Sequence, residues 1–255
     1  CPMGKEIYNP FSDLLTCACW LCALDCLSDT DKKDMCLFLI NRDESLSARR
    51  VTIKILNSFK DRESFDRCFC HAELKMLQKD YPAAITQYNK CLTLKANDKA
   101  VMRSLARAYY ANCDYEKSAF IFDALHTMKP DNMSYQLNYA MAMTKAGKGE
   151  EVINMLFKLE YENPDNVTVS NTLGWSLMYV GRKEQALTAL LKHADSEAVS
   201  QNLAYAYLFN NNITEAVKLL HLLPKEHRID SMRDDADLLG KYDIGEAEMA
   251  ILAAD

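Results

Sequence analysis

Apolar residues recur along most of the chain at a helical spacing and, over a longer range, at a fixed interval. Windows beginning at Phe65, Lys99, Met133 and Val167 are 34 residues apart and share one pattern of apolar positions. A fifth window begins at Glu197, after a window shortened to 30 residues. Positions 4, 7, 8 and 11 of each window form one stripe of a helix, and positions 20, 21, 24, 27 and 28 form another. The pattern therefore predicts a series of units, each made of two amphipathic helices.

Two positions of the unit carry small side chains, which indicates that its two helices approach closely there. The eighth position is small in every window: Ala72, Ala106, Ala140, Gly174 and Ala204. The twentieth position is small, apart from one valine: Ala84, Ser118, Val152, Ala186 and Ala216. Turn-forming residues separate the two stripes at the same phase, as at 147–149 and 210–212. Pro130 and Pro164 close the second and third units, because proline cannot continue a helix.

These residues resemble the tetratricopeptide (TPR) repeat. The strongest matches are Leu105, Ala106 and Tyr109 in the second unit, and Leu173 and Gly174 in the fourth. The sequence departs from the family pattern at Ser118 and Val152, where alanine is usual, and at Ala96, where a proline is usual. The resemblance covers about residues 65–230. It implies an all-α fold, a right-handed α-α superhelix of helix-turn-helix repeats with non-repeat helices at both ends.

The two ends of the chain do not keep the repeat phase. The sequence predicts a degenerate helical region over residues 1–64, with helices over 11–27, 32–41 and 45–60. Five TPR-like repeats follow over residues 65–230. Residues 231–255 predict capping helices, because the last repeat leaves Val217, Leu220 and Leu223 without a following unit. The apolar side of this cap is expected to hold Leu238, Leu239, Ile244, Met249 and Leu252. Its solvent side is expected to hold Asp234, Asp235, Asp237, Glu246 and Glu248.

Positions 2, 5, 9 and 12 of each first helix lie opposite the packed stripe and are expected to face water. The resemblance implies that these positions line a concave groove in which a peptide or protein segment binds. Side chains at or beside these positions give the predicted peptide-binding residues: Arg103, Arg107, Tyr110, Met141, Asn171, Trp175, Tyr179, Gln201 and Tyr205.

The types of these residues indicate the chemistry of the partner. Tryptophan and tyrosine supply large contact areas, and arginine binds a carboxylate with two hydrogen bonds. The groove is therefore suited to an apolar peptide with an acidic group or a free C-terminus. Two simpler interpretations stay open: Arg103 and Arg107 pair with Glu73 or stay solvated, and the chain's own tail or tight curvature covers the aromatic stripe. TPR grooves that bind the tails of heat-shock proteins use lysine at position 5 and asparagine at position 9. This sequence lacks that pattern, so binding of such tails is not expected.

All ten cysteines precede residue 114. Cys19, Cys22 and Cys26 follow Leu15 at helical spacing, so we interpret them as small packed side chains in a reducing compartment, the cytoplasm. The competing interpretation is a metal site built from Cys17, Cys19, Cys22 and Cys26, with Cys68, Cys70 and His71. Helical spacing in an apolar run argues against it, since structural metal sites use pairs of ligands on loops. We therefore expect no metal.

Composition, charge and the absence of known motifs narrow the range of functions that the sequence favours. The net charge of −6 does not imply a strongly basic surface, so nucleic-acid binding is not expected. The longest apolar stretch, residues 14–27, contains Asp25 and is shorter than the ~20 residues of a membrane span. No phosphate-binding, dinucleotide-binding or nucleophile-elbow motif is present, so no cofactor is expected. The sequence predicts a non-enzymatic protein–protein interaction module or adaptor. The alternative is a regulatory or scaffolding fragment of a larger enzyme, and the oligomeric state stays open.

Overall fold

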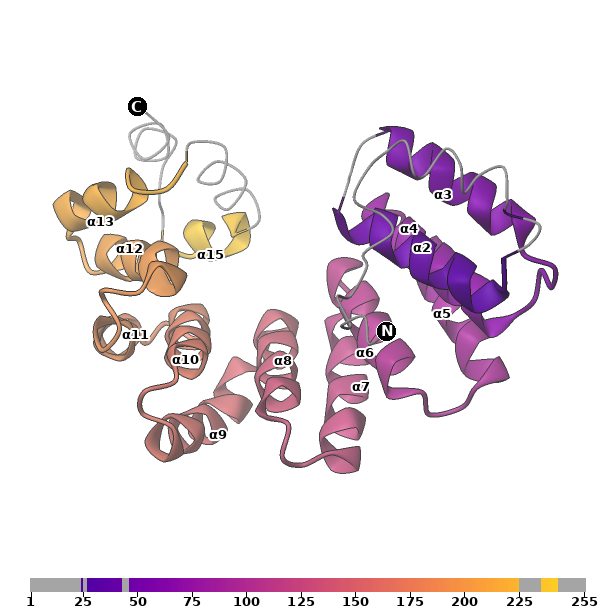
Figure 1. Cartoon of the computed structure of the whole chain (residues 1–255). Coiled ribbons are helices and arrows are strands. Elements are labelled where there is room, and N and C mark those ends of the chain that lie inside the picture. Colours follow the sequence, from indigo (N-terminus) through magenta and orange to yellow (C-terminus); the bar gives the residue numbers. More distant parts are fainter. Residues whose placement is uncertain (1–23, 25–26, 43–45, 225–234, 243–255) are drawn as a thin grey trace, which may run out of the picture. The chain divides into compact units, whose positions relative to one another are not determined.

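The computed structural model describes residues 24, 27–42, 46–224 and 235–242, and over these residues the chain consists of helices joined by turns (Figure 1). The chain divides into two compact units, residues 1–114 and 115–255, and each is described by itself. This division falls inside the second expected repeat. The division expected from the sequence, at residues 64 and 230, stays a prediction.

The first unit contains five described helices. They are α2 (Asp29–Arg42), α3 (Leu46–Ser58), α4 (Phe65–Leu77), α5 (Tyr81–Leu94) and α6 (Lys99–Ala111). The helices expected over 32–41 and 45–60 are confirmed as α2 and α3, whereas the helix expected over 11–27 lies almost wholly outside the described residues. Buried apolar side chains hold α2, α3 and α4 together, among them Met35, Ile55 and Leu74.

The second unit contains the remaining repeats. Its helices are α7 (Tyr115–Met128), α8 (Met133–Met143), the π-helix η2 (Thr144–Lys148), α9 (Gly149–Glu162), α10 (Val167–Tyr179), α11 (Lys183–Leu191), the 3-10 turn η3 (Glu197–Val199), α12 (Ser200–Phe209), α13 (Ile213–Leu220) and the short α15 (Ala236–Gly240). In the last three repeats α8, α10 and α12 are the first helices, and α9, α11 and α13 are the second helices.

The phase of the repeat is confirmed by the residues at which the helices begin. Helices α4, α6, α8 and α10 start at the first residue of their windows, and η3 starts at the first residue of the fifth. A polar residue just before a first helix accepts hydrogen bonds from free backbone N–H groups of its first turn. The side chain of Asp98 accepts from Val101 N at 3.2 Å, Asn132 from Ser134 N at 3.1 Å, and Asn166 from Thr168 N at 3.0 Å.

The small residues lie where two helices approach each other closely, as their positions predict. A Cβ atom on Gly174 of α10 would lie 2.5 Å from Leu190 Cγ of α11. Ala84, Ala106, Ala140 and Ala204, which occupy the same two repeat positions, are fully buried. Small side chains therefore set the distance between neighbouring helices.

The described cysteines of the first unit are packed side chains with one exception. Cys36, Cys68, Cys70 and Cys91 are buried free thiols, and Cys113 is exposed. Burial is the main cause that raises the pKa of the Cys91 thiol to about 12, so this thiol stays protonated at neutral pH. No group of three or more possible metal ligands occurs in the described residues, and the cysteines at 17, 19, 22 and 26 lie outside them.

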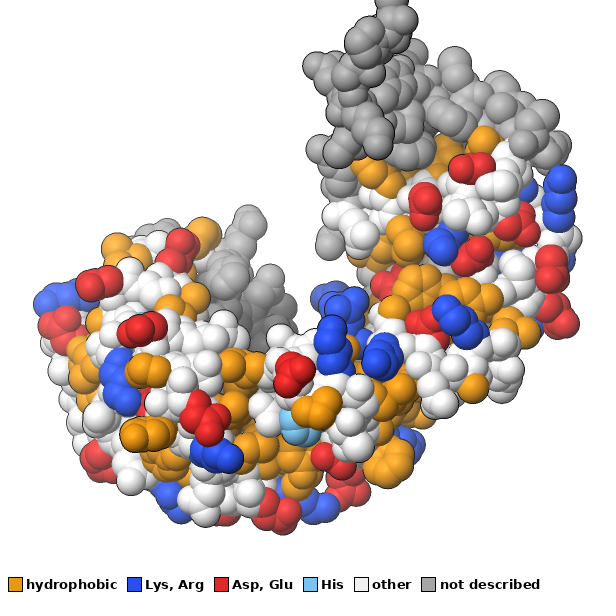
Figure 2. Space-filling model, turned by 60° about the horizontal axis from the view of Figure 1, so that its bottom comes forward, with side chains coloured by type: hydrophobic (Ala, Val, Ile, Leu, Met, Phe, Trp, Pro, Cys, Tyr) orange, Lys and Arg blue, Asp and Glu red, His pale blue; other side chains and the backbone are white. Residues whose placement is uncertain are grey.

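No helix within the described ranges has the length and apolar character needed to cross a membrane. On the face presented in Figure 2, hydrophobic side chains and charges of both signs are interspersed over each unit. Such a mixture of apolar and charged groups is usual for a protein surface.

Candidate functional site

The first helices α8, α10 and α12 line one face of the second unit, which we call the groove face. A pocket of about 350 Å³ lies on it. Four of the residues predicted for peptide binding line this pocket: Met141, Asn171, Trp175 and Gln201. The other lining residues are Thr168, Thr172, Ala198, Asn202 and Asp235. The helical spacing therefore brings side chains of three successive repeats to one pocket.

The other predicted residues lie elsewhere. The ring of Tyr179 lies 4.5 Å from that of Trp175, next to the pocket. Tyr205 lies in the core beside Phe209, with ring centroids 6.3 Å apart. Arg103, Arg107 and Tyr110 are on α6 and so belong to the first unit.

The expected exposure of the groove positions is wrong for the large side chains. Trp175 is 8% exposed, Tyr179 6% and Tyr205 0%, and Leu137, Met178, Leu208 and Phe209 are also buried. Part of the reason is the chain's own residues 235–242, which we call the C-terminal segment. They lie on the groove face and contact Trp175, Tyr179 and Phe209. Of the interpretations left open, coverage by the tail applies to these three residues.

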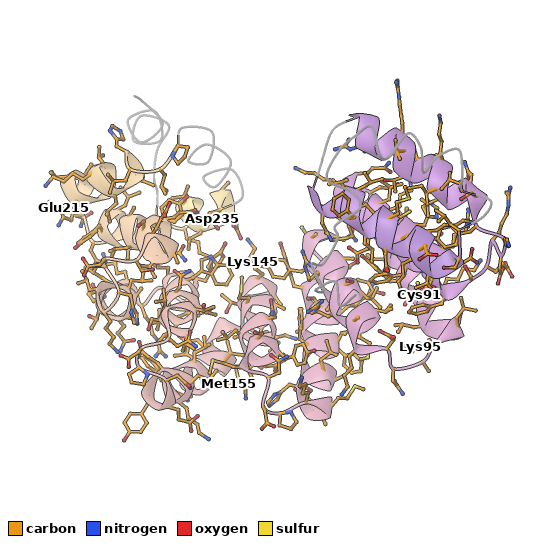
Figure 3. The ribbon with its side chains drawn as sticks, viewed as in Figure 1. Cys91, Lys95, Lys145, Met155, Glu215 and Asp235 are labelled. Atoms are coloured by element: carbon orange, nitrogen blue, oxygen red, sulfur yellow. The ribbon has the colours of Figure 1, made fainter. Side chains whose placement is uncertain are left out.

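Polar contacts attach the C-terminal segment to the groove face. Lys145 Nζ lies 2.8 Å from Asp237 Oδ2, and the Tyr179 hydroxyl donates to Asp237 Oδ1 at 2.8 Å. Gln201 Nε2 donates to Asp235 Oδ2 at 3.0 Å, and the Trp175 side chain also donates to Asp235. In Figure 3, Lys145 and Asp235 lie close together, whereas Met155 and Glu215 lie on outer parts of the unit.

Apolar contacts continue from these polar ones along the segment. Leu238 is 0% and Leu239 2% exposed. The ring of Tyr242 stacks on that of Phe209, with centroids 3.8 Å apart and planes within 10° of parallel. The Tyr242 hydroxyl donates to Met178 O at 2.7 Å, so the segment also binds a backbone carbonyl in the last turn of α10.

The two aspartates of the segment have opposite pKa shifts. Burial is the main cause that raises the pKa of Asp235, and it outweighs the charge of Lys145 and the hydrogen bonds from Trp175 and Gln201. Burial also favours a raised pKa for Asp237, but the hydrogen bonds from Lys145 and Tyr179 and the charge of Lys145 outweigh it and lower the pKa. The carboxylate of Asp237 is therefore the one that the groove stabilises in its charged form.

These contacts correct part of the expected cap. Asp235 was expected to face water, but it is partly buried in the pocket lining, and Asp237 is exposed yet paired with Lys145. Leu238 and Leu239 are on the buried side, as expected. Ile244, Met249, Leu252, Asp234, Glu246 and Glu248 lie outside the described residues, so the full cap over 231–255 stays a prediction.

Sequence reasoning missed Lys145, although a signal for it exists. The stripe through positions 5 and 9 continues, four residues on, at position 13. This position holds Lys145, Tyr179 and Phe209 in the last three repeats, and all three contact the C-terminal segment. Extending the stripe by one turn of helix would have found Lys145 as well.

The two arginines of the first unit present exposed side chains on α6. Glu73, the partner considered for them, accepts hydrogen bonds from other residues. Its Oε1 accepts from the Tyr88 hydroxyl at 2.8 Å and from the Ser104 hydroxyl at 2.9 Å. The arginine pair stays a predicted anion-binding position of the first unit.

Solved structures that resemble the chain include TPR proteins. A thermophilic TPR protein of Thermus thermophilus has a TM-score of 0.52 and 17% identity, covering 70% of this chain and 97% of that one. PilF of Pseudomonas aeruginosa has a TM-score of 0.54 and 14% identity, covering 76% and 90%. TPR-like repeats of a putative kinesin light chain from Podospora anserina have a TM-score of 0.55 and 14% identity, covering 68% and 97%.

No protein-family model matches the chain, and no curated protein sequence matches it either. The likeness to solved structures is therefore one of fold. It confirms the fold expected from the sequence, an all-α helical-repeat architecture of the TPR type.

Proposed function

We propose that the chain is a non-enzymatic protein-interaction module that holds a segment of a partner protein on the groove face of its last three repeats. The pocket carries this proposal, because Met141, Asn171, Trp175 and Gln201 come from three successive first helices and line one cavity. A partner would meet a largely pre-formed surface, which reduces the ordering cost of binding. The TPR-like fold supports the same role, since the resemblance implies groove binding.

The partner is a protein segment with an acidic group. Lys145 supplies a cation at the edge of the groove face, and its ammonium lies over the rings of Tyr115 and Tyr179 at 5.9 Å and 5.1 Å from their centroids. The rings attract the ammonium, and the positive charge of the ammonium favours a carboxylate ligand at this point. Arg103, Arg107 and Tyr110 are a second proposed anion-binding position, in the first unit.

A cytoplasmic location is part of the proposal. It is supported by Cys36, Cys68, Cys70 and Cys91, which are buried as free thiols in the first unit. Disulfides are rare in reducing compartments, where thiols of this kind persist.

A displayed library of random peptides tests the proposed function. The library is selected against the intact chain, and the selected peptides are then measured on two variants that place tryptophan at an exposed threonine. Thr168→Trp fills the pocket, since Thr168 lines it, whereas the matched control Thr188→Trp lies on α11 away from the pocket lining. We expect binding to weaken by about tenfold or more in the first variant only. Failure to select any peptide, or equal binding to both variants, would contradict the proposal.

A further inference from the structure

We propose that the groove recognises acidic leucine-containing segments, and that the chain's own C-terminal segment is a built-in competitor of this type. The preferred partner segment carries two aspartates separated by one residue, of which the second binds as a carboxylate, then a leucine pair directly after the second aspartate, and an aromatic residue three positions beyond the pair. The inference rests on the proposed function, and it names the partner chemistry and the regulation of the same site.

The polar half of the segment matches groups that the groove face already presents. Asp237 accepts hydrogen bonds from the ammonium of Lys145 and the hydroxyl of Tyr179. Asp235 accepts hydrogen bonds from the side chains of Gln201 and Trp175. Three of these four groups, Tyr179, Gln201 and Trp175, are residues that the sequence analysis assigns to peptide binding. A segment from another protein with the same two carboxylates would find the same donors.

The apolar half explains the leucine pair and the aromatic residue. Leu238 and Leu239 are buried, and Tyr242 stacks on Phe209 while its hydroxyl donates to Met178 O. The segment thus combines buried anchors with charge-assisted hydrogen bonds, which is how peptide ligands obtain both affinity and orientation.

The position of the segment favours a ligand over a pure end cap. Its contacts are with η2, α10 and α12 on the groove face, and Asp235 itself lines the open pocket. On the second helices, by contrast, Ile213 is 48% exposed, and Leu222 just beyond α13 is 77% exposed. The segment therefore covers the groove face and leaves apolar side chains at the end of the last repeat exposed.

Competition follows directly from this occupancy. A partner can bind only molecules whose groove is free, so its apparent dissociation constant is the intrinsic one divided by the free fraction. If the segment occupies the groove in about nine of ten molecules, an external segment binds roughly tenfold more weakly than it would to an open groove. Releasing the C-terminal segment is then a way to switch binding on.

A labelled synthetic peptide with the sequence of residues 231–245 tests the inference on the full chain. Wild type is compared with Leu238→Asp/Leu239→Asp, which removes the buried anchors, and with Leu222→Asp, which makes the same change at an exposed leucine. We expect the peptide to bind the double variant about tenfold or more tightly than wild type or Leu222→Asp. Circular dichroism checks folding, and Asp237→Lys serves as a second undocked variant if the double variant does not fold.

A charge reversal identifies the contact that carries recognition. In the Leu238→Asp/Leu239→Asp variant, whose own segment is undocked, Lys145→Glu is expected to weaken binding of the peptide by about tenfold or more. A peptide carrying lysine in place of Asp237 is expected to restore binding to Lys145→Glu, which loss of folding would not allow.

Several outcomes would overturn the inference. One is equal binding of the peptide to wild type and to the undocked variants, and another is binding to neither. If library peptides still depend on Thr168 in either case, the proposed function stands and only the competitor is rejected. A doubling of mass with rising concentration that Leu238→Asp/Leu239→Asp abolishes would assign the segment to a second copy of the chain, and would also overturn it.

Discussion

The residue that joins the two helices of a repeat has a left-handed backbone conformation in all five repeats. These residues are Lys79, Cys113, Gly147, Gly181 and Asn211, with φ between 58° and 87°. In the first repeat, Lys79 N donates to Met76 O and Asp80 N donates to Lys75 O, which closes the end of α4. The period of the sequence thus extends to the backbone conformation, even where the residue at this position is not glycine.

The first prediction concerns this turn position. Side chains other than glycine and asparagine are strained in the left-handed region by about 1–2 kcal/mol. Lys79→Gly is therefore expected to stabilise the first unit by up to about 1 kcal/mol, after the entropy that glycine loses on folding is subtracted. Gly181→Ala makes the reverse change and is expected to destabilise the second unit by about 1 kcal/mol. Urea unfolding measures both, and effects of the same sign would contradict the prediction.

The second prediction concerns the contact between α10 and α11. Gly174→Ala adds a Cβ at 2.5 Å from Leu190 Cγ, so either Leu190 or the helix must move. Overpacking of this kind is expected to cost about 1–3 kcal/mol of stability. Gly240→Ala is the control, because a Cβ there meets nothing within 4 Å. The midpoint of thermal unfolding should fall clearly further in Gly174→Ala than in Gly240→Ala. A fall no larger than that of the control would show that Leu190 and the helix accommodate the added Cβ without cost.

At the scale of the elements, the docking of the C-terminal segment on the groove face depends on pH. Asp237 has a lowered pKa in the docked state, so its contribution to docking is present above the free pKa of about 3.9 and is lost as the pH falls through the docked pKa. Asp235 has a raised pKa, so its contribution is fully present below the free value and is lost as the pH rises through the docked pKa. The two shifts act in opposite directions.

The third prediction follows from these signs. Docking of the segment is expected to be strongest near the free carboxyl pKa of about 3.9 and to weaken as the pH moves above or below that value. Asp235→Asn should remove the weakening towards neutral pH, and Asp237→Asn should weaken docking at neutral pH. Amide hydrogen exchange at Leu238 and Leu239 reports docking directly. A flat pH profile in wild type, or the same profile in both asparagine variants, would refute the coupling.

The sequence predicts the helices better than it predicts the surface of the groove. Helix starts are set by local signals such as the capping side chains of Asp98, Asn132 and Asn166, and these can be read directly. Burial of Trp175 and Tyr179 depends on a segment more than 50 residues away, joined by contacts that no periodic pattern encodes. The periodic pattern predicts which helix face carries Trp175 and Tyr179, but it does not predict that the C-terminal segment covers them.

At the scale of the whole chain, the fourth prediction compares two truncations. Removing residues 231–255 deletes Leu238 and Leu239, which are buried, and Tyr242, which stacks on Phe209 of the groove face. The midpoint of thermal unfolding is expected to fall by about 5–10 °C, since a fully buried leucine contributes about 1.5–3 kcal/mol. Removing only 243–255 keeps these contacts and serves as the control. Equal midpoints for the two truncated chains would show that the segment adds no stability.

The contact between Trp175 and Asp235 has a spectroscopic consequence. The chain contains two tryptophans, and the indole of Trp175 is 8% exposed beneath the C-terminal segment. Release of the segment would admit water to this indole and shift its fluorescence emission to longer wavelength. With Trp20→Phe as the background, the emission maximum of Trp175 would report groove occupancy in real time without any attached dye.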